Sequence, residues 1–261
     1  MTQEEKQKMS FRNTTIIVAA TLLIAAQVLA APAKKPGWKP EPYSCRRASA
    51  PIIVDGILDD AAWKQAKVIN MRIPVTYALA RSKTEVQILW DDKYLYFAFR
   101  AFDKDIWSYM QDHDSVTCFD DVLEMFFMPI PGSGHYHNFE INAIGTVYDA
   151  YSLSRYAGGG DHHRWRRWDC QGLKTGITIT GTLNNPSDVD SHWCMEVAIP
   201  FAEMPDVPNG CPKVGDKWTF HASRYDYSVH LPDGVELSST AALTKVDFHH
   251  AKDWMPLVFT N

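Results

Sequence analysis

The sequence predicts an all-β protein, a jelly-roll-like antiparallel β-sandwich with one short helix. Three observations predict this fold. Apolar residues mostly recur at every second position in short runs, which is the period of a strand with one buried face. Turns rich in Gly, Pro, Asn and Asp separate these runs. The composition is 46% hydrophobic and 12% aromatic, which is enough apolar material for one core and excludes a disordered chain.

The N-terminal segment is predicted to be a signal peptide covering residues 1–30. Basic residues precede the apolar stretch 14–30, and Val28 and Ala30 place small residues before the expected cleavage site. An uncleaved membrane anchor is the alternative, but this stretch is at the short limit for one. We therefore expect a secreted or periplasmic protein with no stable membrane insertion after cleavage. Residues 31–45 are rich in Pro and Lys and are predicted to be a tether, followed by one domain over 46–261.

Two hairpins are predicted from the sequence. Residues 86–90 and 94–101 are joined by Asp91-Asp92-Lys93, and residues 122–128 and 136–142 flank a Pro- and Gly-containing loop. Many short strands separated in this way favour a sandwich of one domain. Further strands are expected over 148–153, 176–182, 193–199, 218–227 and 257–259, a helix over 59–66, and loops over 156–170 and 184–191.

Charge and cysteine usage restrict the function classes. Lys and Arg total 26 against 31 Asp and Glu, a net charge of −5, so the chain lacks the positive field that nucleic-acid binding needs. No nucleic-acid partner is expected. None of the five cysteines forms a C-x-x-C pair, which excludes a zinc ribbon or a thioredoxin motif. Export permits disulfides, and two bridges with one remaining thiol are expected, with the pairing left open.

The hairpin over 122–142 carries the residues best suited to a site. Strand alternation places Asn138, Glu140 and Asn142 on one face, opposite the apolar residues between them. If the loop is centred near 131–132, Glu124 lies opposite Glu140. Directly opposed carboxylates repel each other, so an arginine (Arg100 or Arg155), a calcium ion or a shared proton should compensate. The plain alternative is a polar face that only meets solvent, which is common on antiparallel sheets.

Several segments, in chain order, resemble the motifs of carbohydrate-binding module family 9. Ile53-Val54-Asp55-Gly56-Ile57-Leu58-Asp59-Asp60-Ala61-Ala62-Trp63 is similar to the family's entry motif I-D-G-x-L-D-E-x-x-W. The other matching segments are Leu89–Tyr96 (first hairpin), Asp121–Phe126 (D-x-V-E-x-F), Phe139–Gly145 (F-x-x-N-x-x-G), Trp193–Phe201 (W-x-x-E-x-A-I-P) and the closing Phe248-His249 with Trp254.

The resemblance implies a β-sandwich that binds sugar between two aromatic rings, with polar side chains on the hydroxyl groups and structural calcium nearby. Glu124 matches the family's ligand-binding glutamate, and Asn142 matches the Asn of F-x-x-N. Glu140 stands where the family has a binding arginine. The positions of the two clamp tryptophans fall on Cys118, with Phe119 beside it, and near Phe248.

We therefore predict a secreted carbohydrate-binding protein that holds a plant or algal polysaccharide or oligosaccharide and supports its catabolism, with a catalytic glycosidase as a partner in trans. A pyranose ring needs a flat aromatic face and planar polar side chains that reach adjacent hydroxyl groups. The candidate binding residues are Glu124, Asn142, Glu140, Asn138, Phe119, Phe248, Trp107 and Trp165. Asp120 and Asp121 are candidate ligands of a structural calcium ion, because calcium prefers oxygen ligands from loops.

Two other functions stay open at this point. Glycoside hydrolysis needs two carboxylates roughly 5–10 Å apart, a distance that Glu124 and Glu140 could satisfy. A haem-binding, cytochrome-like domain would use axial ligands such as Met110 and His113.

The segment 161–169 concentrates three arginines and two tryptophans. It is either a site for acidic glycans, since Arg binds carboxylates bidentately, or an insertion loop whose Trp168 fills the core.

Overall fold

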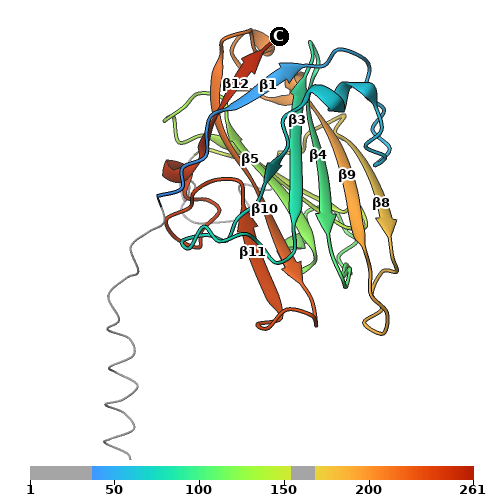
Figure 1. The fold of residues 1–261 in the computed structure, drawn as a ribbon. Coiled ribbons are helices and arrows are strands. Elements are labelled where there is room, and N and C mark those ends of the chain that lie inside the picture. Colours follow the sequence, from blue (N-terminus) through green and yellow to red (C-terminus); the bar gives the residue numbers. More distant parts are fainter. Residues whose placement is uncertain (1–36, 154–167) are drawn as a thin grey trace, which may run out of the picture. The chain divides into compact units, whose positions relative to one another are not determined.

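The computed structural model describes residues 37–153 and 168–261 (Figure 1). The expected signal peptide 1–30, residues 31–36 of the expected tether and Trp165 lie outside the described residues. No helix within the described ranges is long and apolar enough to cross a membrane. The strands are β1 (Tyr43–Arg47), β2 (Ile69–Asn70), β3 (Thr84–Trp90), β4 (Tyr94–Phe102), β5 (Val122–Met128), β6 (Tyr136–Asn142), β7 (Val147–Ser152), β8 (Lys174–Thr180), β9 (His192–Pro200), β10 (Lys217–Tyr227), β11 (Val235–Ser239) and β12 (Met255–Thr260).

The twelve strands form one hydrogen-bonded sheet that curls over on itself, in the order β7-β6-β5-β10-β12-β1-β3-β4-β9-β8. β11 pairs with β10, and β2 pairs with β3. We call β7-β6-β5-β10-β11 leaflet A and β2-β3-β4-β9-β8 leaflet B; β12 and β1 connect them (Figure 1). The pairs are antiparallel except at β1, which runs parallel to both β12 and β3. The predicted all-β sandwich is confirmed, with these two parallel pairs as an addition.

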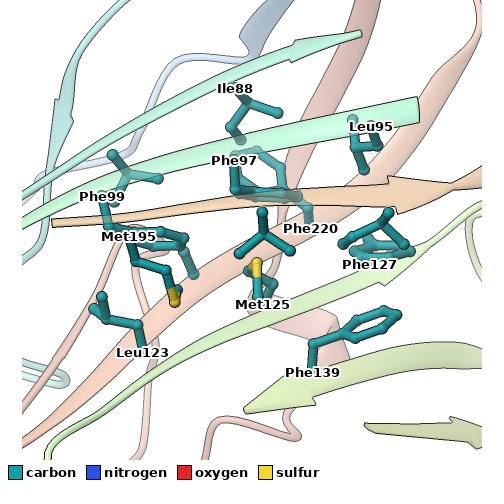
Figure 2. Packing of buried hydrophobic residues seen from close by; sticks show 14 of the residues in the cluster. Ile88, Leu95, Phe97, Phe99, Leu123, Met125, Phe127, Phe139, Met195 and Phe220 are labelled. Carbon is teal, nitrogen blue, oxygen red and sulfur yellow. The ribbon is translucent and has the colours of Figure 1, made fainter. Parts of the chain in front are cut away.

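The main core lies between the two leaflets. Leu123, Met125 and Phe127 alternate along β5 and face Phe97 and Phe99 from β4, as Figure 2 shows. The rings of Phe97 and Phe127 are stacked with centroids 6.4 Å apart. Each large apolar side chain that is fully buried in this way contributes roughly 1.5–3 kcal/mol. The alternation along β5 therefore leaves its other face, which carries Glu124, pointing away from the core.

The only helical structure in the described ranges is short 3-10 turns: η1 (Ala61–Gln65), η2 (Thr117–Phe119), η3 (Phe201–Glu203), η4 (Pro208–Gly210) and η5 (Ala251–Asp253). The helix expected over 59–66 is present as η1. Its Trp63 and the D-G turn before it are both tied to Glu196 on β9. Oε1 of Glu196 accepts a hydrogen bond from the Trp63 indole at 2.7 Å, and Oε2 accepts the backbone N–H of Asp55 and Gly56 at 3.1 and 3.0 Å. The entry motif and the W-x-x-E motif are thus two halves of one structural lock.

Close backbone contact explains why the entry motif has a glycine at position 56. Gly56 lies against the backbone of β8 with a φ of +83°, and a Cβ atom placed there would come within 2.6 Å of the Ile177 carbonyl carbon. On β8, a Cβ atom on Gly176 would come within 2.5 Å of the Asp55 carbonyl carbon. The two backbones therefore touch at a point where neither chain has room for a side chain.

Two sequence expectations change in the structure. No disulfide joins the five cysteines. Cys45, Cys170 and Cys194 are buried at separate positions on β1, before β8 and on β9, where they act as small apolar side chains. The first strand also begins inside the range expected for the tether, because Tyr43 is buried and its hydroxyl donates to the Lys67 carbonyl at 2.7 Å.

Candidate functional site

A polar row crosses the outer face of leaflet A. Glu124 on β5 lies opposite Glu140 on β6 and, on its other side, opposite Ser223 on β10. Tyr148 on β7 lies opposite Glu140 and extends the row. The opposition of the two carboxylates expected from the hairpin register is therefore confirmed.

Glu124 is held deep in this row. Its side chain is 2% exposed, and its Oε2 atom accepts a hydrogen bond from the Ser223 hydroxyl at 2.8 Å. Burial, reinforced by the neighbouring charge of Glu140, raises the pKa of Glu124 well above its usual value. Arg100, one of the expected compensating residues, lies on β4 in leaflet B beside Glu85, and Arg155 lies outside the described residues. The raised pKa favours a retained proton on Glu124 as the compensation, and a protonated carboxyl is both a donor and an acceptor.

Glu140 and Asn138 form the second polar unit. The Asn138 amide donates to Glu140 Oε1 at 2.9 Å, and the Thr117 hydroxyl of η2 donates to Glu140 Oε2 at 3.0 Å. Asn138 is 2% exposed, and its Oδ1 atom accepts no hydrogen bond within the described part of the chain. An unsatisfied buried acceptor beside an acid pair is an arrangement that a ligand hydroxyl group can complete.

Two further tyrosines beside this row were missed by sequence reasoning. Tyr225 and Tyr227 alternate along β10 on the same face as Ser223, with parallel rings 6.5 Å apart. The Tyr227 hydroxyl donates to the Cys118 carbonyl in η2 at 2.8 Å. Burial, and next the charge of Glu124, raise the pKa of Tyr225, which places this ring beside the acid pair. The alternation Tyr225-Asp226-Tyr227 in a predicted strand was the available signal.

The two expected clamp positions have different environments. Phe119 is 67% exposed at the end of η2, so its ring is accessible. Phe248 is buried and packs edge-on against Tyr225 with ring centroids 5.2 Å apart. Phe248 therefore packs beside Tyr225 and is not accessible, while Phe119 is exposed at the end of η2. Trp107 pairs with the ring of Tyr109, in the loop that precedes η2.

Asn142 is an anchor of the surrounding loops. Its amide nitrogen donates to the Met110 carbonyl and to Asp120 Oδ2, and its Oδ1 atom accepts the backbone N–H of Thr146 at 2.8 Å. Asp120 also accepts the N–H of Tyr109 and of Met110. Both side chains are buried, and their hydrogen bonds fix the loop before η2 against the start of β7.

Asp121 belongs to a buried cluster that already contains a cation. Asp103, Asp121 and Asp226 bring carboxylate oxygens within 4.8 Å of one another. Arg224 lies among them, with Nη2 at 2.6 Å from Asp103 and 2.8 Å from Asp226. Both Asp121 oxygens accept backbone N–H groups, those of Trp107 and Tyr227. Burial raises the pKa of Asp103 to about 7. The guanidinium and the backbone donors bind the oxygens of Asp103 and Asp121 and Oδ1 of Asp226, whereas Asp226 Oδ2 accepts no hydrogen bond from the described residues. Calcium at Asp120 and Asp121 stays a prediction.

A separate cleft of about 510 Å³ lies on leaflet B and η1. Trp63, Lys64, Gln87 and Arg100 contribute to its lining. The Trp63 indole N–H already donates its hydrogen bond to Glu196, so it stabilises the fold and does not offer a donor to a ligand in this cleft.

Comparison with solved structures supports the same fold. A family 9 carbohydrate-binding module from Caldicellulosiruptor kristjanssonii in complex with cellotriose has a TM-score of 0.56 at 12% identity, covering 84% of this chain and 94% of that chain. The complex of a family 9 module from the same organism with glucose has a TM-score of 0.55 at 12% identity, covering 84% and 96%. A candidate carbohydrate-binding protein from Bacteroides uniformis has a TM-score of 0.62 at 14% identity, covering 84% and 99%.

No curated protein matches the chain in sequence. The family model described as carbohydrate family 9 binding domain-like, however, matches residues 54–258, which is most of the chain. This range includes both halves of the Glu196 lock and the whole polar row of leaflet A. The chain belongs to the carbohydrate family 9 binding domain-like family.

Proposed function

We propose that the protein binds a polysaccharide or oligosaccharide on the outer face of leaflet A. The observation that carries this proposal is the row of Glu124, Glu140 and Asn138, which lies beside the ring of Tyr225. A pyranose has apolar C–H faces that stack on an aromatic ring and equatorial hydroxyl groups that need both donors and acceptors. The row supplies both, because Glu124 retains a proton while Asn138 offers an unsatisfied carbonyl oxygen.

The nature of the ligand is narrowed by the relatives. Family 9 modules that share this fold were solved with cellotriose and with glucose, which supports a glucose-containing oligosaccharide as the first ligand to test. A few hydrogen bonds, each with a net contribution on the order of 1 kcal/mol, together with stacking predict micromolar to millimolar dissociation constants. A plant or algal polysaccharide is the natural source of such chains.

The setting of this activity is also a proposal. Cleavage of residues 1–30 would release the protein as a secreted or periplasmic sugar binder that supports carbohydrate catabolism. A glycosidase acting in trans would then degrade the captured polysaccharide. N-terminal sequencing of the protein expressed from the full chain tests the first step, and a start at Ala31 is the expected result.

A glycan-array screen of the same protein, with and without calcium, tests binding, and each positive glycan is then measured by calorimetry. Glu124→Gln is the decisive variant, because it keeps the shape of the side chain but changes its hydrogen bonding. Glu85→Gln in leaflet B is the matched control. Saturable binding that Glu124→Gln weakens and Glu85→Gln leaves unchanged is expected. Equal affinity in all three proteins would overturn the proposal.

Glycoside hydrolysis has one observation in its favour, since two opposed carboxylates with a raised pKa on one of them resemble an acid and its partner. Each positive glycan is therefore also assayed for released reducing sugar. Release that Glu124→Gln abolishes would replace binding with catalysis as the function of this face.

A further inference from the structure

A second cluster of potential ligands lies at β7, away from the polar row. His113 and Asp114 come from the loop between β4 and η2, Asp149 comes from β7, and Asp169 precedes β8. One ligand atom of each lies within 4.8 Å of the others. Asp149 lies opposite the core residue Phe139, so it points to the other face of leaflet A from the proposed sugar site.

The distances within this cluster suit a small metal ion. His113 Nε2 lies 3.3 Å from Asp149 Oδ1, 3.4 Å from Asp169 Oδ1 and 3.7 Å from Asp114 Oδ1. Zinc binds His nitrogen and Asp oxygen at about 2.0–2.2 Å in a tetrahedron, which places neighbouring ligand atoms about 3.3–3.6 Å apart. The distances from His113 Nε2 are therefore near those that a tetrahedral ion requires, and the remaining pairs of donor atoms lie within 4.8 Å of one another.

Asp149 provides an independent indication of a ligand. It is 1% exposed, and its Oδ2 atom accepts the Cys170 backbone N–H at 2.6 Å. Its Oδ1 atom accepts no hydrogen bond from the described residues and is directed at His113. A buried carboxylate oxygen without a hydrogen-bond donor is costly, and a bound cation would satisfy it.

We propose that His113, Asp114, Asp149 and Asp169 bind a divalent transition metal ion, with Zn²⁺ as the best match. The imidazole of His113 indicates the class of metal ion. Calcium and magnesium take oxygen ligands, whereas imidazole nitrogen suits zinc and other first-row transition metals. Three carboxylates converge at this point, and a divalent cation would reduce the repulsion between them. The ion would tie three separate segments of the chain together at β7, and its role would be structural. This site does not depend on the proposed sugar binding.

The test uses protein expressed from the full chain, treated with a chelator and dialysed. Titration with ZnCl₂ in a calorimeter, and native mass spectrometry, measure the affinity and the number of ions. The expected result is one saturable Zn²⁺ per chain, with Ca²⁺ much weaker at the same residues. His113→Gln and Asp149→Asn should each weaken Zn²⁺ binding by more than about tenfold. Asp112→Asn is the control. It removes one carboxylate charge, as Asp149→Asn does, from the loop that carries His113, but it removes no proposed ligand, so it should leave the Zn²⁺ affinity unchanged.

The His113 side chain is 51% exposed, so His113→Gln should not prevent folding. If Asp149→Asn fails to fold, His113→Gln alone decides, with circular dichroism as the check of its fold. Absence of saturable Zn²⁺ binding would overturn the proposal, and so would equal Zn²⁺ affinity in wild type and His113→Gln. Ca²⁺ binding that is tighter than Zn²⁺ binding and is weakened by Asp149→Asn would also overturn it.

Discussion

Glu124 on β5 lies directly opposite Glu140 on β6, and its pKa is raised first by its own burial and next by that neighbour. An acid pair on a sheet face would normally be destabilising when both groups are ionised. Here the pair is embedded with Ser223, Thr117 and Asn138 as hydrogen-bond donors. The arrangement keeps a proton and several directed hydrogen-bonding groups in one place, which is the chemistry that recognition of hydroxyl groups requires.

This relationship predicts a pH-dependent stability. An unfolded glutamate loses its proton near pH 4.5, whereas folded Glu124 retains it to higher pH. Its contribution to stability is therefore full below pH 4.5 and is lost as the pH rises through the raised pKa, at about 1.4 kcal/mol per pH unit. Glu124→Gln cannot ionise, so its free energy of unfolding should exceed that of wild type at pH 7 and approach it near pH 4. Urea unfolding across this range measures the difference, and parallel pH profiles would contradict the assignment.

The lock between Trp63 and Glu196 predicts a loss of stability. Trp63→Phe removes the indole donor and leaves Glu196 Oε1 without it, so the free energy of unfolding should fall by about 1–3 kcal/mol. The neighbouring exposed Lys64→Ala should stay within roughly 0.5 kcal/mol of wild type. Urea denaturation of both variants provides the comparison. A loss for Trp63→Phe no larger than that for Lys64→Ala would show that the indole bond does not stabilise the fold.

Substitution of the two asparagines of β6 should affect different properties: Asn142 the stability of the fold, and Asn138 the affinity for sugar. Asn142→Ala removes an amide that anchors two loops and should lower the free energy of unfolding by roughly 2–4 kcal/mol. Asn138→Ala removes only one hydrogen bond to Glu140 and should cost about 1 kcal/mol, while weakening sugar binding more strongly. Denaturation and calorimetry on both proteins check this split. The opposite ranking in either measurement would contradict the roles assigned here.

Phe119 provides the aromatic test. Because its ring is 67% exposed, Phe119→Ala should leave the melting temperature unchanged. Sugar binding should weaken by about 0.5–1.5 kcal/mol if the ring stacks on the ligand. Tyr109→Ala removes another exposed ring, 60% exposed in the preceding loop, and serves as the control. Calorimetric affinities that change equally in the two variants would argue against stacking at Phe119.

Much of the sandwich was predictable because its central strands alternate clearly. Alternation along 122–128 and 136–142 predicted both the strands and the opposition of Glu124 and Glu140, since the loop between them is short. β1 was not predictable in the same way. It has only two inward residues, Tyr43 and Cys45, and its parallel partners β12 and β3 come from distant parts of the chain.

The residues on the sheet face of the site were predictable from the sequence, but the loops around that face were not. Alternation gives the face that a side chain occupies, and so it grouped Asn138 with Asn142. It does not give the loops that cover that face, and these make Asn142 an anchor. Phe248 was expected as a clamp, but its neighbours bury it beside Tyr225. Trp168 does pack against the core, with its ring 5.9 Å from Phe139, in agreement with the core-filling alternative for its segment.

The most direct test of the central claim is an NMR titration of the isotope-labelled protein with cellotriose. The account predicts that the amide shifts concentrate on the outer face of β5, β6 and β10 and on η2, around Glu124, Asn138 and Tyr225. Shifts that concentrate instead at the leaflet B cleft around Trp63 and Arg100 would contradict it.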